Sequence, residues 1–436
     1  MNAAAARPLA WGDCRKRFAE FEGDLPGSGS DWLRKARRTA LDRFSERGFP
    51  TERDEAWRFT PVGPVSQTSF ALASAAPAGI APVPLADFEA ERLVFMDGAF
   101  RPELSGVAAL PAGVELSSLG AVLRSEPGRV EPYLALGGAD AFGALNGALF
   151  TDGLFLKVSK GIILKRPIHL LFSTGASGAT AAMAHWRNLV VLEAGAQAQI
   201  IEEYHGVGAC LANATTDIRV GEGARLEHSL LQLQSLESFF VSGLRARLDR
   251  SAYFSGCNYS FGSALARADA SIFLAGEGAE CELNGLMLGR GKQHLDHHTL
   301  IDHAAPRGTS RELFKGVLDG HAKAVFDGAI MVRPEAQKTD ARVYNKNLLL
   351  SDTALANTKP VFQINANDVQ CKHGAAVGQL SPEALFYFRS RGIGASEARR
   401  LLVQGFAGEV LEGAAPAPLR EALERRLIAW LDGREG

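Results

Sequence analysis

Four segments in the middle of the chain decide the fold: GAQAQIIEEY (195–204), GARLEHSLLQ (223–232), SAYFSGCNYS (251–260) and GAECELNGLM (278–287). They align without gaps at intervals of 28, 28 and 27 residues. After the shared alanine, polar or amphipathic residues alternate with apolar ones, which is the period of a β-strand. At roughly 3.3 Å per extended residue, one coil is long enough to travel around a flattened tube and return beside its own start. The repeat therefore predicts a parallel β-helix.

The alternation also indicates which side chains point into the tube. Ala198, Leu226, Phe254 and Cys281 are equivalent apolar positions in the four segments. In a solenoid each inward residue stacks on its equivalent one coil away, so no coil is stable alone and the ends need caps. We expect these four residues in the core, with Cys281 as a buried structural thiol rather than a reactive one.

The rest of the chain is organised around this tube. Beyond the fourth segment the repeat weakens, but VFDGAIMV (325–332) and the residues from 340 to 351 still have the composition of strands. We expect a mainly β protein in which the β-helix core occupies residues 146–378. An N-terminal region, helical plus irregular, then covers residues 1–145, and a C-terminal helical domain covers residues 379–436.

Two segments of the N-terminal region give a structural prediction. Residues 31–48 have apolar side chains at helical spacing, with Asp31 as a candidate N-cap and Gly48 and Pro50 as stop signals. Residues 63–92 are rich in Pro, Ala and Ser and have little periodicity, so we expect a loop or a segment draped over another domain.

The C-terminal region changes to a helical period. Ser381 followed by Pro382 is typical of a helix start, and Gly392 is expected to close that helix. Two further helices each present one apolar face. Their apolar residues are Ala398, Leu401, Leu402, Phe406 and Val410 in one, and Leu419, Ala422, Leu423, Leu427 and Trp430 in the other. These faces could cap the tube or receive a partner, and the period does not distinguish the two.

Composition excludes several classes of function. The 436 residues are 46% hydrophobic and 22% charged, which indicates two or three folded domains. With 47 basic and 49 acidic residues, no overall field attracts nucleic acid or a membrane surface. The five cysteines form no CxxC pair, and no run of 18 apolar residues or secretory signal occurs, so we expect a reduced, cytoplasmic protein. A phosphate-binding loop, a dinucleotide fingerprint, GxSxG and HExxH are all missing from the sequence.

Histidines gather in HLDHHTLIDH, where His294, His297, His298 and His303 could be metal ligands. On a strand, His294 and His298 would share one face. Because no fixed thiolate or carboxylate partner accompanies them, we favour turn and stacking histidines over a metal site.

Cys371 and His373 are the strongest candidates for chemistry. Two residues apart on a strand, they project from one face with β-carbons about 6 to 7 Å apart, while Lys372 points the other way. One soft metal ion or one sulfur species could contact both. A neighbouring imidazole would also lower the pKa of the thiol, as sulfur transfer or iron ligation requires. Taken alone, this spacing more often marks a core cysteine beside a hydrogen-bonded histidine.

The surrounding residues carry a family resemblance. KTDARVYNKNLLLS (338–351), ANTKPVFQINANDVQCKHGAAVGQL (356–380) and LFYFRSRGI (385–393) resemble, in this order, the carboxyl-terminal signature of the SufB/SufD family of iron-sulfur cluster assembly scaffolds. RDEAWRFT (53–60) and VFMDGAFRPELS (94–105) look like earlier family segments. The DVxCxHGAxxG form is similar to SufD rather than SufB, although Asn367 and Lys372 replace an Asp and a small residue that are commoner in the family.

The resemblance implies a right-handed parallel β-helix flanked by helical domains. It implies a SufB-like partner packed through the β-helices and SufC-like ATPase subunits docked on the C-terminal helices. It further implies that Cys371 and His373 transiently hold iron, sulfide or a nascent cluster at the SufB-like interface, with no stably bound cofactor.

Our first hypothesis is therefore a SufD-type scaffold that is not itself an enzyme and that could pair with itself in isolation. The alternatives are a SufB-like subunit, which is the main site of cluster assembly, and a secreted β-helix enzyme acting on carbohydrate. The last would need paired carboxylates along a groove, and the sequence shows none.

Overall fold

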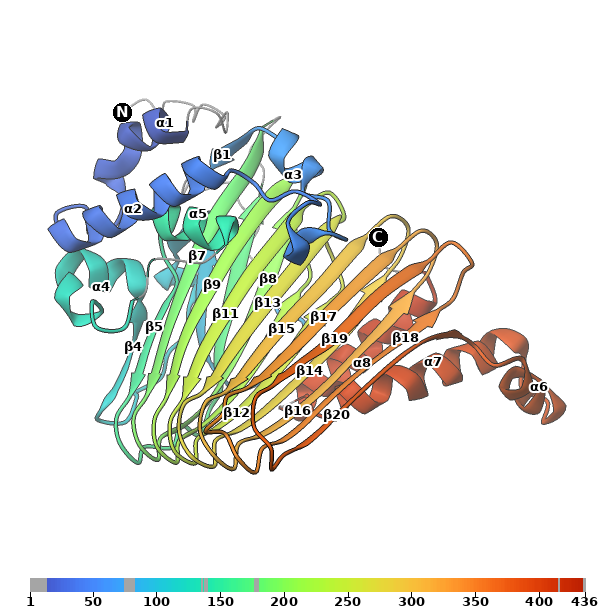
Figure 1. The fold of residues 1–436 in the computed structure, drawn as a ribbon. Helices are drawn as coiled ribbons and strands as arrows, with labels where there is room; N and C mark the ends of the chain where they lie inside the picture. The colour runs from blue at the N-terminus through green and yellow to red at the C-terminus, as the bar shows by residue number, and fades with distance from the viewer. Residues whose placement is uncertain are drawn as a thin grey trace.

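The computed structural model describes residues 14–73, 83–134, 136, 140–175, 180–414 and 416–433, except the side chains at 14 and 17. Its centre is a β-solenoid of about seven turns, built from two long sheets that face each other across a flattened tube (Figure 1). Helices flank the tube at both ends of the chain. The predicted fold class, a mainly β parallel β-helix with helical flanks, is confirmed.

From β5 to β20, successive strands alternate between the two sheets, so each coil contributes one strand to each. The first sheet has the order β19-β17-β15-β13-β11-β9-β7-β5-β4, with β1 beside β7. Its strands are β1 (Phe70–Leu72), β4 (Val114–Ser118), β5 (Leu154–Val158), β7 (Ala181–Leu192), β9 (Cys210–Val220), β11 (Phe239–Leu248), β13 (Leu265–Leu274), β15 (His294–His303), β17 (Lys323–Val332) and β19 (Leu355–Ile364). The second has the order β20-β18-β16-β14-β12-β10-β8-β6-β2-β3. Its strands are β2 (Glu91–Met96), β3 (Ala99–Phe100), β6 (Ile168–Gly175), β8 (Gln197–Val207), β10 (Arg225–Gln232), β12 (Tyr253–Ser260), β14 (Glu280–Gly289), β16 (Thr309–Leu318), β18 (Asp340–Leu349) and β20 (Gln370–Gln379).

The pairing register of neighbouring strands matches the gap-free alignment of the four sequence repeats. Strands β8, β10, β12 and β14 pair in parallel so that Ala198, Leu226, Phe254 and Cys281 lie side by side. All four are buried in one continuous core that runs through the tube. The inward positions and the buried state of Cys281 are therefore confirmed, because a period of two within each strand and a period near 28 between strands leave only one register that buries the apolar face.

Helices of the N-terminal region cover the outer face of the first sheet (Figure 1). They are α1 (Cys14–Phe21), α2 (Asp31–Arg47), α3 (Gly63–Gln67), α4 (Leu119–Ser125) and α5 (Ala141–Leu149), with 3-10 turns at Glu22–Asp24, Glu55–Trp57, Pro102–Leu104 and Pro127–Arg129. Apolar side chains of α2 and α5 pack on outward residues such as Met183, Leu211 and Val241. Helix α2 confirms the helix predicted over 31–48, and Gly48 ends it at φ 68°.

Two details of the N-terminal prediction are wrong. Ser30, not Asp31, is the N-cap of α2, and Asp31 is its first helical residue. Residues 63–92 are not all irregular, because they include α3, β1 and the beginning of β2. Residues 74–82 lie outside the described residues. The segment after them is draped as expected: Leu85, Ala86 and Phe88 pack on the outer face of the second sheet.

Three C-terminal helices follow the tube: α6 (Pro382–Ser390), α7 (Ala395–Leu411) and α8 (Ala417–Leu431). Helices α7 and α8 pack on the outer face of the second sheet, whereas α6 extends away from it (Figure 1). The hydroxyl of Ser381 accepts a hydrogen bond from the Ala384 N–H, as a helix cap should.

The apolar face of α8 is as predicted, but that of α7 is rotated. The buried residues of α7 are Ala398, Val403, Ala407, Val410 and Leu411. Leu401 is exposed, and Leu402 and Phe406 are only half-buried. The difference arises because α7 also contacts α6 and α8, so apolar residues occur around much of its circumference and its own period does not select the side that meets the sheet.

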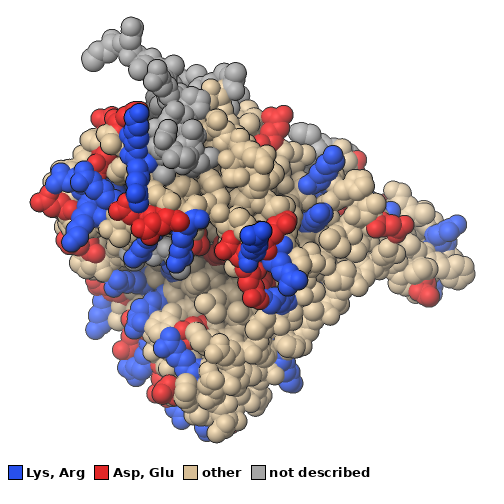
Figure 2. All heavy atoms as spheres, turned by 45° about the horizontal axis from the view of Figure 1, so that its top comes forward, with Lys and Arg blue, Asp and Glu red and all other residues tan. Residues whose placement is uncertain are grey.

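The tube remains open at its C-terminal end. Strands β19 and β20 are the last strands of their sheets, and no other described strand pairs with their outer edges. Ile364 and Val377 point into the tube, because their register partners Val332 and Asn347 are buried inside, yet they are 40% and 45% exposed. No described helix caps this end. On the face shown in Figure 2, basic and acidic side chains are interspersed, in line with the near-balanced charge of the chain.

Candidate functional site at the open end of the tube

Strand β20 places Cys371 and His373 on the same, inward face. Cys371 pairs in register with Ala341 and His373 with Val343, and both partners are fully buried in the core. Cys371 itself packs against the core and is partly buried, while His373 is exposed. The two side chains therefore line the inner wall of the last coil, at the C-terminal end where the inside of the tube is exposed.

A third residue joins them from the facing sheet. Phe362 of β19 points inward opposite β20, and its ring lies 4.8 Å from the imidazole of His373 between ring centres. Phe362 was not among the predicted site residues. The signal was available, because Phe362 is offset by about one coil from the inward Ile330.

The thiol of Cys371 is not activated in the isolated chain. Partial burial raises its pKa, the negative charge of Asp340 raises it further, and a hydrogen bond with the Ala341 backbone only partly opposes this. The net direction is opposite to the lowering that we expected from the neighbouring imidazole. The imidazole is exposed to solvent, which weakens any charge effect that it exerts on the thiol. The raised pKa keeps the Cys371 thiol protonated at neutral pH.

The other cysteines whose side chains the structure describes are buried. Cys210, Cys257 and Cys281 are buried and free, and burial raises the pKa of the first two to about 12 and about 11. The side chain of Cys14 lies outside the described residues. Among the described cysteines, only Cys371 is accessible enough to exchange a ligand.

The four histidines of 294–303 lie on strand β15, not in a turn, and they divide between its two faces. His297 and His303 point into the tube, where they hydrogen-bond to Ser260 and Ser310. His294 and His298 point outward, as predicted for a strand, and contact Thr60 and Asp296. Within the described residues, no group of three His, Cys, Asp or Glu side chains could hold a metal ion. Each of the four imidazoles has a hydrogen-bond or ion-pair partner within the protein.

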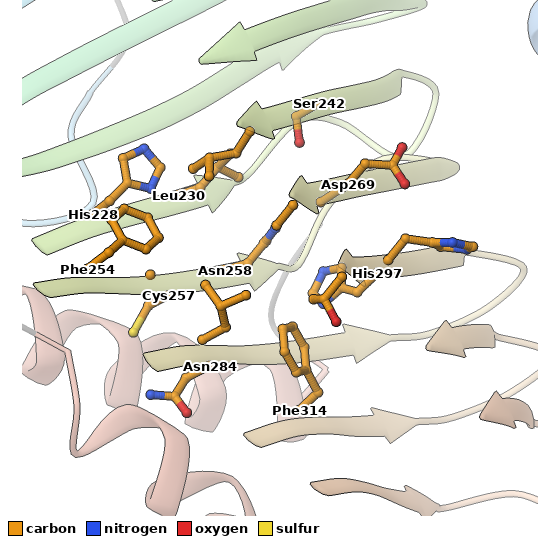
Figure 3. Close-up of a pocket in the computed structure, with 17 residues that line it drawn as sticks. His228, Leu230, Ser242, Phe254, Cys257, Asn258, Asp269, Asn284, His297 and Phe314 are labelled. Atoms are coloured by element: carbon orange, nitrogen blue, oxygen red, sulfur yellow. The ribbon is translucent and has the colours of Figure 1, made fainter. Parts of the chain in front are cut away.

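A small interior cavity of about 50 Å³ lies next to His297 (Figure 3). His228, Asn258 and Phe314 also line it, from β10, β12 and β16. Burial lowers the pKa of His297 to about 4, so this imidazole is neutral at pH 7. A cavity of this size admits water molecules but not a drug-sized ligand or organic cofactor.

The fold and the site define the class of protein: a β-solenoid that offers one thiol and one imidazole, both potential ligands for a soft or borderline metal, at an unpaired end. No helix in the described part of the chain has the length and apolar character to cross a membrane. Comparison with known families then identifies the chain. Residues 172–406 match the SufBD core domain of the SUF system for FeS cluster assembly, and residues 15–170 match the SufBD N-terminal region.

Proteins with assigned names are similar to this chain over most of its length. A SufBD family protein of Synechocystis is 32% identical over 416 residues, covering 92% of both chains. The iron-sulfur cluster assembly protein SufD of Escherichia coli is 29% identical over 397 residues, covering 90% of this chain and 92% of its own. A second Synechocystis family protein is 27% identical over 343 residues, or 74% of this chain and 70% of its own. The chain belongs to the SufB/SufD family of iron-sulfur cluster assembly proteins and is of the SufD type.

Proposed function

We propose that this protein is a non-catalytic, SufD-type scaffold subunit that helps to form or transfer a nascent iron-sulfur cluster at its interface with a SufB-like sister subunit. One observation carries this proposal: Cys371 and His373 lie together on the inner wall of the unpaired last coil. A sister solenoid that docks on β19 and β20 would place its own groups next to this pair. Family membership supports the reaction, since both family models that match concern this assembly system.

The two potential ligands, Cys371 and His373, fit transient binding of iron or sulfide rather than a permanently bound cofactor. A thiolate and an imidazole together supply two ligands, which is fewer than the four that a cluster or a tetrahedral iron needs. The remaining ligands must come from the sister subunit or from the sulfur species itself. A site with half of its ligands holds iron or sulfide weakly, and weak binding suits a scaffold that must release its product.

The test is cluster assembly by the reconstituted complex. Cys371→Ser and His373→Ala should each lower the yield of the cluster, measured by its visible absorption and by acid-labile sulfide. Ala375→Ser is the matched control, because Ala375 lies on the same face of β20 and is also exposed. Unchanged yield in both ligand variants, with the complex intact, would remove the site assignment.

The C-terminal helices are proposed as the docking site of the SufC-like ATPase. The sequence has no phosphate-binding loop of its own, so the proposal assigns ATP hydrolysis to a partner. Helix α6 extends from the body and exposes Phe386 and Tyr387 by 72% and 57% of their surfaces. Exposed aromatic side chains of this size are typical anchors of protein interfaces. Among the large apolar residues of α6 and α7, Phe386 and Leu401 are exposed, whereas Leu385, Leu402 and Phe406 are half-buried.

Phe386→Asp and Leu401→Asp should therefore weaken capture of the ATPase without unfolding the tube. Leu104→Asp is the control, because Leu104 is an exposed apolar residue of the N-terminal region. Capture can be measured by co-purification and by surface binding of the purified ATPase. Full capture by both helix variants would place the ATPase elsewhere. The near-balanced charge supports a protein that binds neither nucleic acid nor membranes. The cytoplasmic location is proposed from the cysteine pattern and the missing secretory signal.

A further inference from the structure

The imidazole of His373 is held by an aromatic ring and not by a polar group. Its centre lies 4.8 Å from the centre of the Phe362 ring, and the two planes are inclined by 48°. Within the described residues the imidazole has no hydrogen bond and no ion pair. His169 is different, because its Nε2 lies 2.9 Å from the carboxylate of Glu203. The Phe362 ring is therefore the group of this chain that can set the orientation of His373.

The Phe362 ring is itself fixed by the tube. Phe362 is the register partner of Ile330 on β17, and its half-buried side chain packs against the core. His373, in contrast, is exposed on the last strand of the second sheet. Rings whose centres are roughly 4.5 to 7 Å apart attract each other when they are tilted or offset. The contact therefore joins an anchored ring to one that would otherwise turn freely in solvent.

This contact leaves both imidazole nitrogens available. A metal-binding histidine usually donates its second N–H to a carboxylate, a carbonyl or water, and that hydrogen bond fixes the ring. The phenyl ring of Phe362 restricts the imidazole but competes for neither nitrogen, because it has no hydrogen-bonding atom. Cys371, two residues before His373, shares the inward face and packs against the same core. A metal ion that binds this thiol needs the imidazole in one defined orientation.

We propose that Phe362 is a positioning residue, whose ring holds the His373 imidazole in the orientation that binds iron together with Cys371. This inference rests on the proposed function and adds to it a residue from the facing sheet. Holding the imidazole in advance reduces the conformational freedom that is lost when iron binds, so the ring strengthens binding without touching the metal. Because Phe362 acts only through His373, its effect must disappear when the imidazole is removed.

Binding of Co²⁺ to the complex reconstituted from the full-length chain and its SufB-like and SufC-like partners tests the inference. The absorption bands of bound Co²⁺ report coordination by a thiolate and an imidazole, independently of cluster formation. Phe362→Leu should weaken Co²⁺ binding roughly three- to tenfold, which is the contribution of one ring pair. Phe362→Tyr keeps the ring and should bind Co²⁺ as the wild type does. Phe273→Leu is the matched control, because Phe273 is a half-buried phenylalanine on β13 that contacts Arg247 and Arg333 instead of a candidate ligand.

A double-mutant cycle separates positioning from packing. In the His373→Ala background, Phe362→Leu should change Co²⁺ binding by less than about twofold. A loss of the same size as in the wild-type background would overturn the inference, because the ring would then act through packing. So would a loss as large in Phe362→Tyr as in Phe362→Leu, or weaker docking of the sister scaffold to the Phe362→Leu variant. If the His373→Ala variant binds Co²⁺ as tightly as the wild type, the proposed function fails and this inference fails with it. If His373→Ala weakens binding and Phe362→Leu does not, only the inference fails.

Discussion

The protonation state of Glu312 is the most direct test of how burial in the tube affects a charged side chain. It points inward from β16 beside Leu283 of β14, and it is buried with no hydrogen-bond partner for either carboxyl oxygen among the described residues. Burial raises its pKa from 4.5 to about 8, opposed only slightly by the nearby hydroxyl of Thr299. The carboxyl group is therefore protonated in the folded protein at neutral pH, whereas it is ionised in the unfolded chain.

The sign of the pH dependence follows from this difference. Below about pH 4.5 both states are protonated and Glu312 has no effect on the pH dependence of stability. Between about pH 4.5 and pH 8 the folded state holds one proton more, so stability falls as the pH rises, by about 1.4 kcal/mol per unit. Over the full shift of about 3.5 units this amounts to about 5 kcal/mol at most, and water entering the neighbouring cavity would reduce it.

Glu312→Gln removes the titration and keeps the shape. We expect the variant to match the wild type within about 1 kcal/mol at pH 5 and to be more stable by about 2 to 5 kcal/mol at pH 8.5. Urea unfolding at several pH values measures the difference, and titrations of other groups cancel in it. Glu280→Gln, an exposed change at the start of β14, should show no such trend. A difference that does not grow with pH would refute the buried, protonated carboxyl.

Two further substitutions test the packing. Leu226→Ala should lower the free energy of unfolding by about 2 to 5 kcal/mol in urea titrations, because Leu226 is fully buried in the tube, while Glu227→Ala on the outer face should change it by less than about 0.5 kcal/mol. Asp296→Asn should lower the free energy of unfolding by about 3 to 5 kcal/mol, because it leaves the buried Arg267 with a weaker counter-charge. Asp296 and Arg267 also anchor residues 53–60 through hydrogen bonds, so limited proteolysis should cut this segment faster in the variant. Unchanged proteolysis would mean that the segment is held by other contacts.

The sequence predicts the tube because one repeat length and one strand period act at once. Ala198 and Leu226 are aligned by the repeat and also lie on the apolar side of the alternation, so local and long-range preferences agree. The C-terminal helix α7 has no such second constraint. Its apolar residues Leu401 and Phe406 satisfy a helical period but lie away from the buried side. Helix α7 contacts α6, α8 and the second sheet, so its own period does not determine which side is buried.

The position of the site was predictable, but its electrostatics were not. The spacing of Cys371 and His373 fixes a common face as soon as the segment is a strand. The pKa of the thiol depends instead on Asp340, which is 31 residues away in sequence and on the adjacent strand. Only the register of β18 against β20 brings this charge near the thiol.

The raised pKa of Cys371 constrains how the site can work. A sister subunit that merely covers the open end would bury the thiol further, and burial alone raises the pKa still more. Docking by itself therefore moves Cys371 away from the thiolate that iron or sulfur chemistry requires. In the proposed function a bound metal ion would stabilise the thiolate, and His373 is the other potential metal ligand on this face of β20. Thiol deprotonation and arrival of the metal are then one coupled step, because a bound metal ion displaces the proton from its thiol ligand.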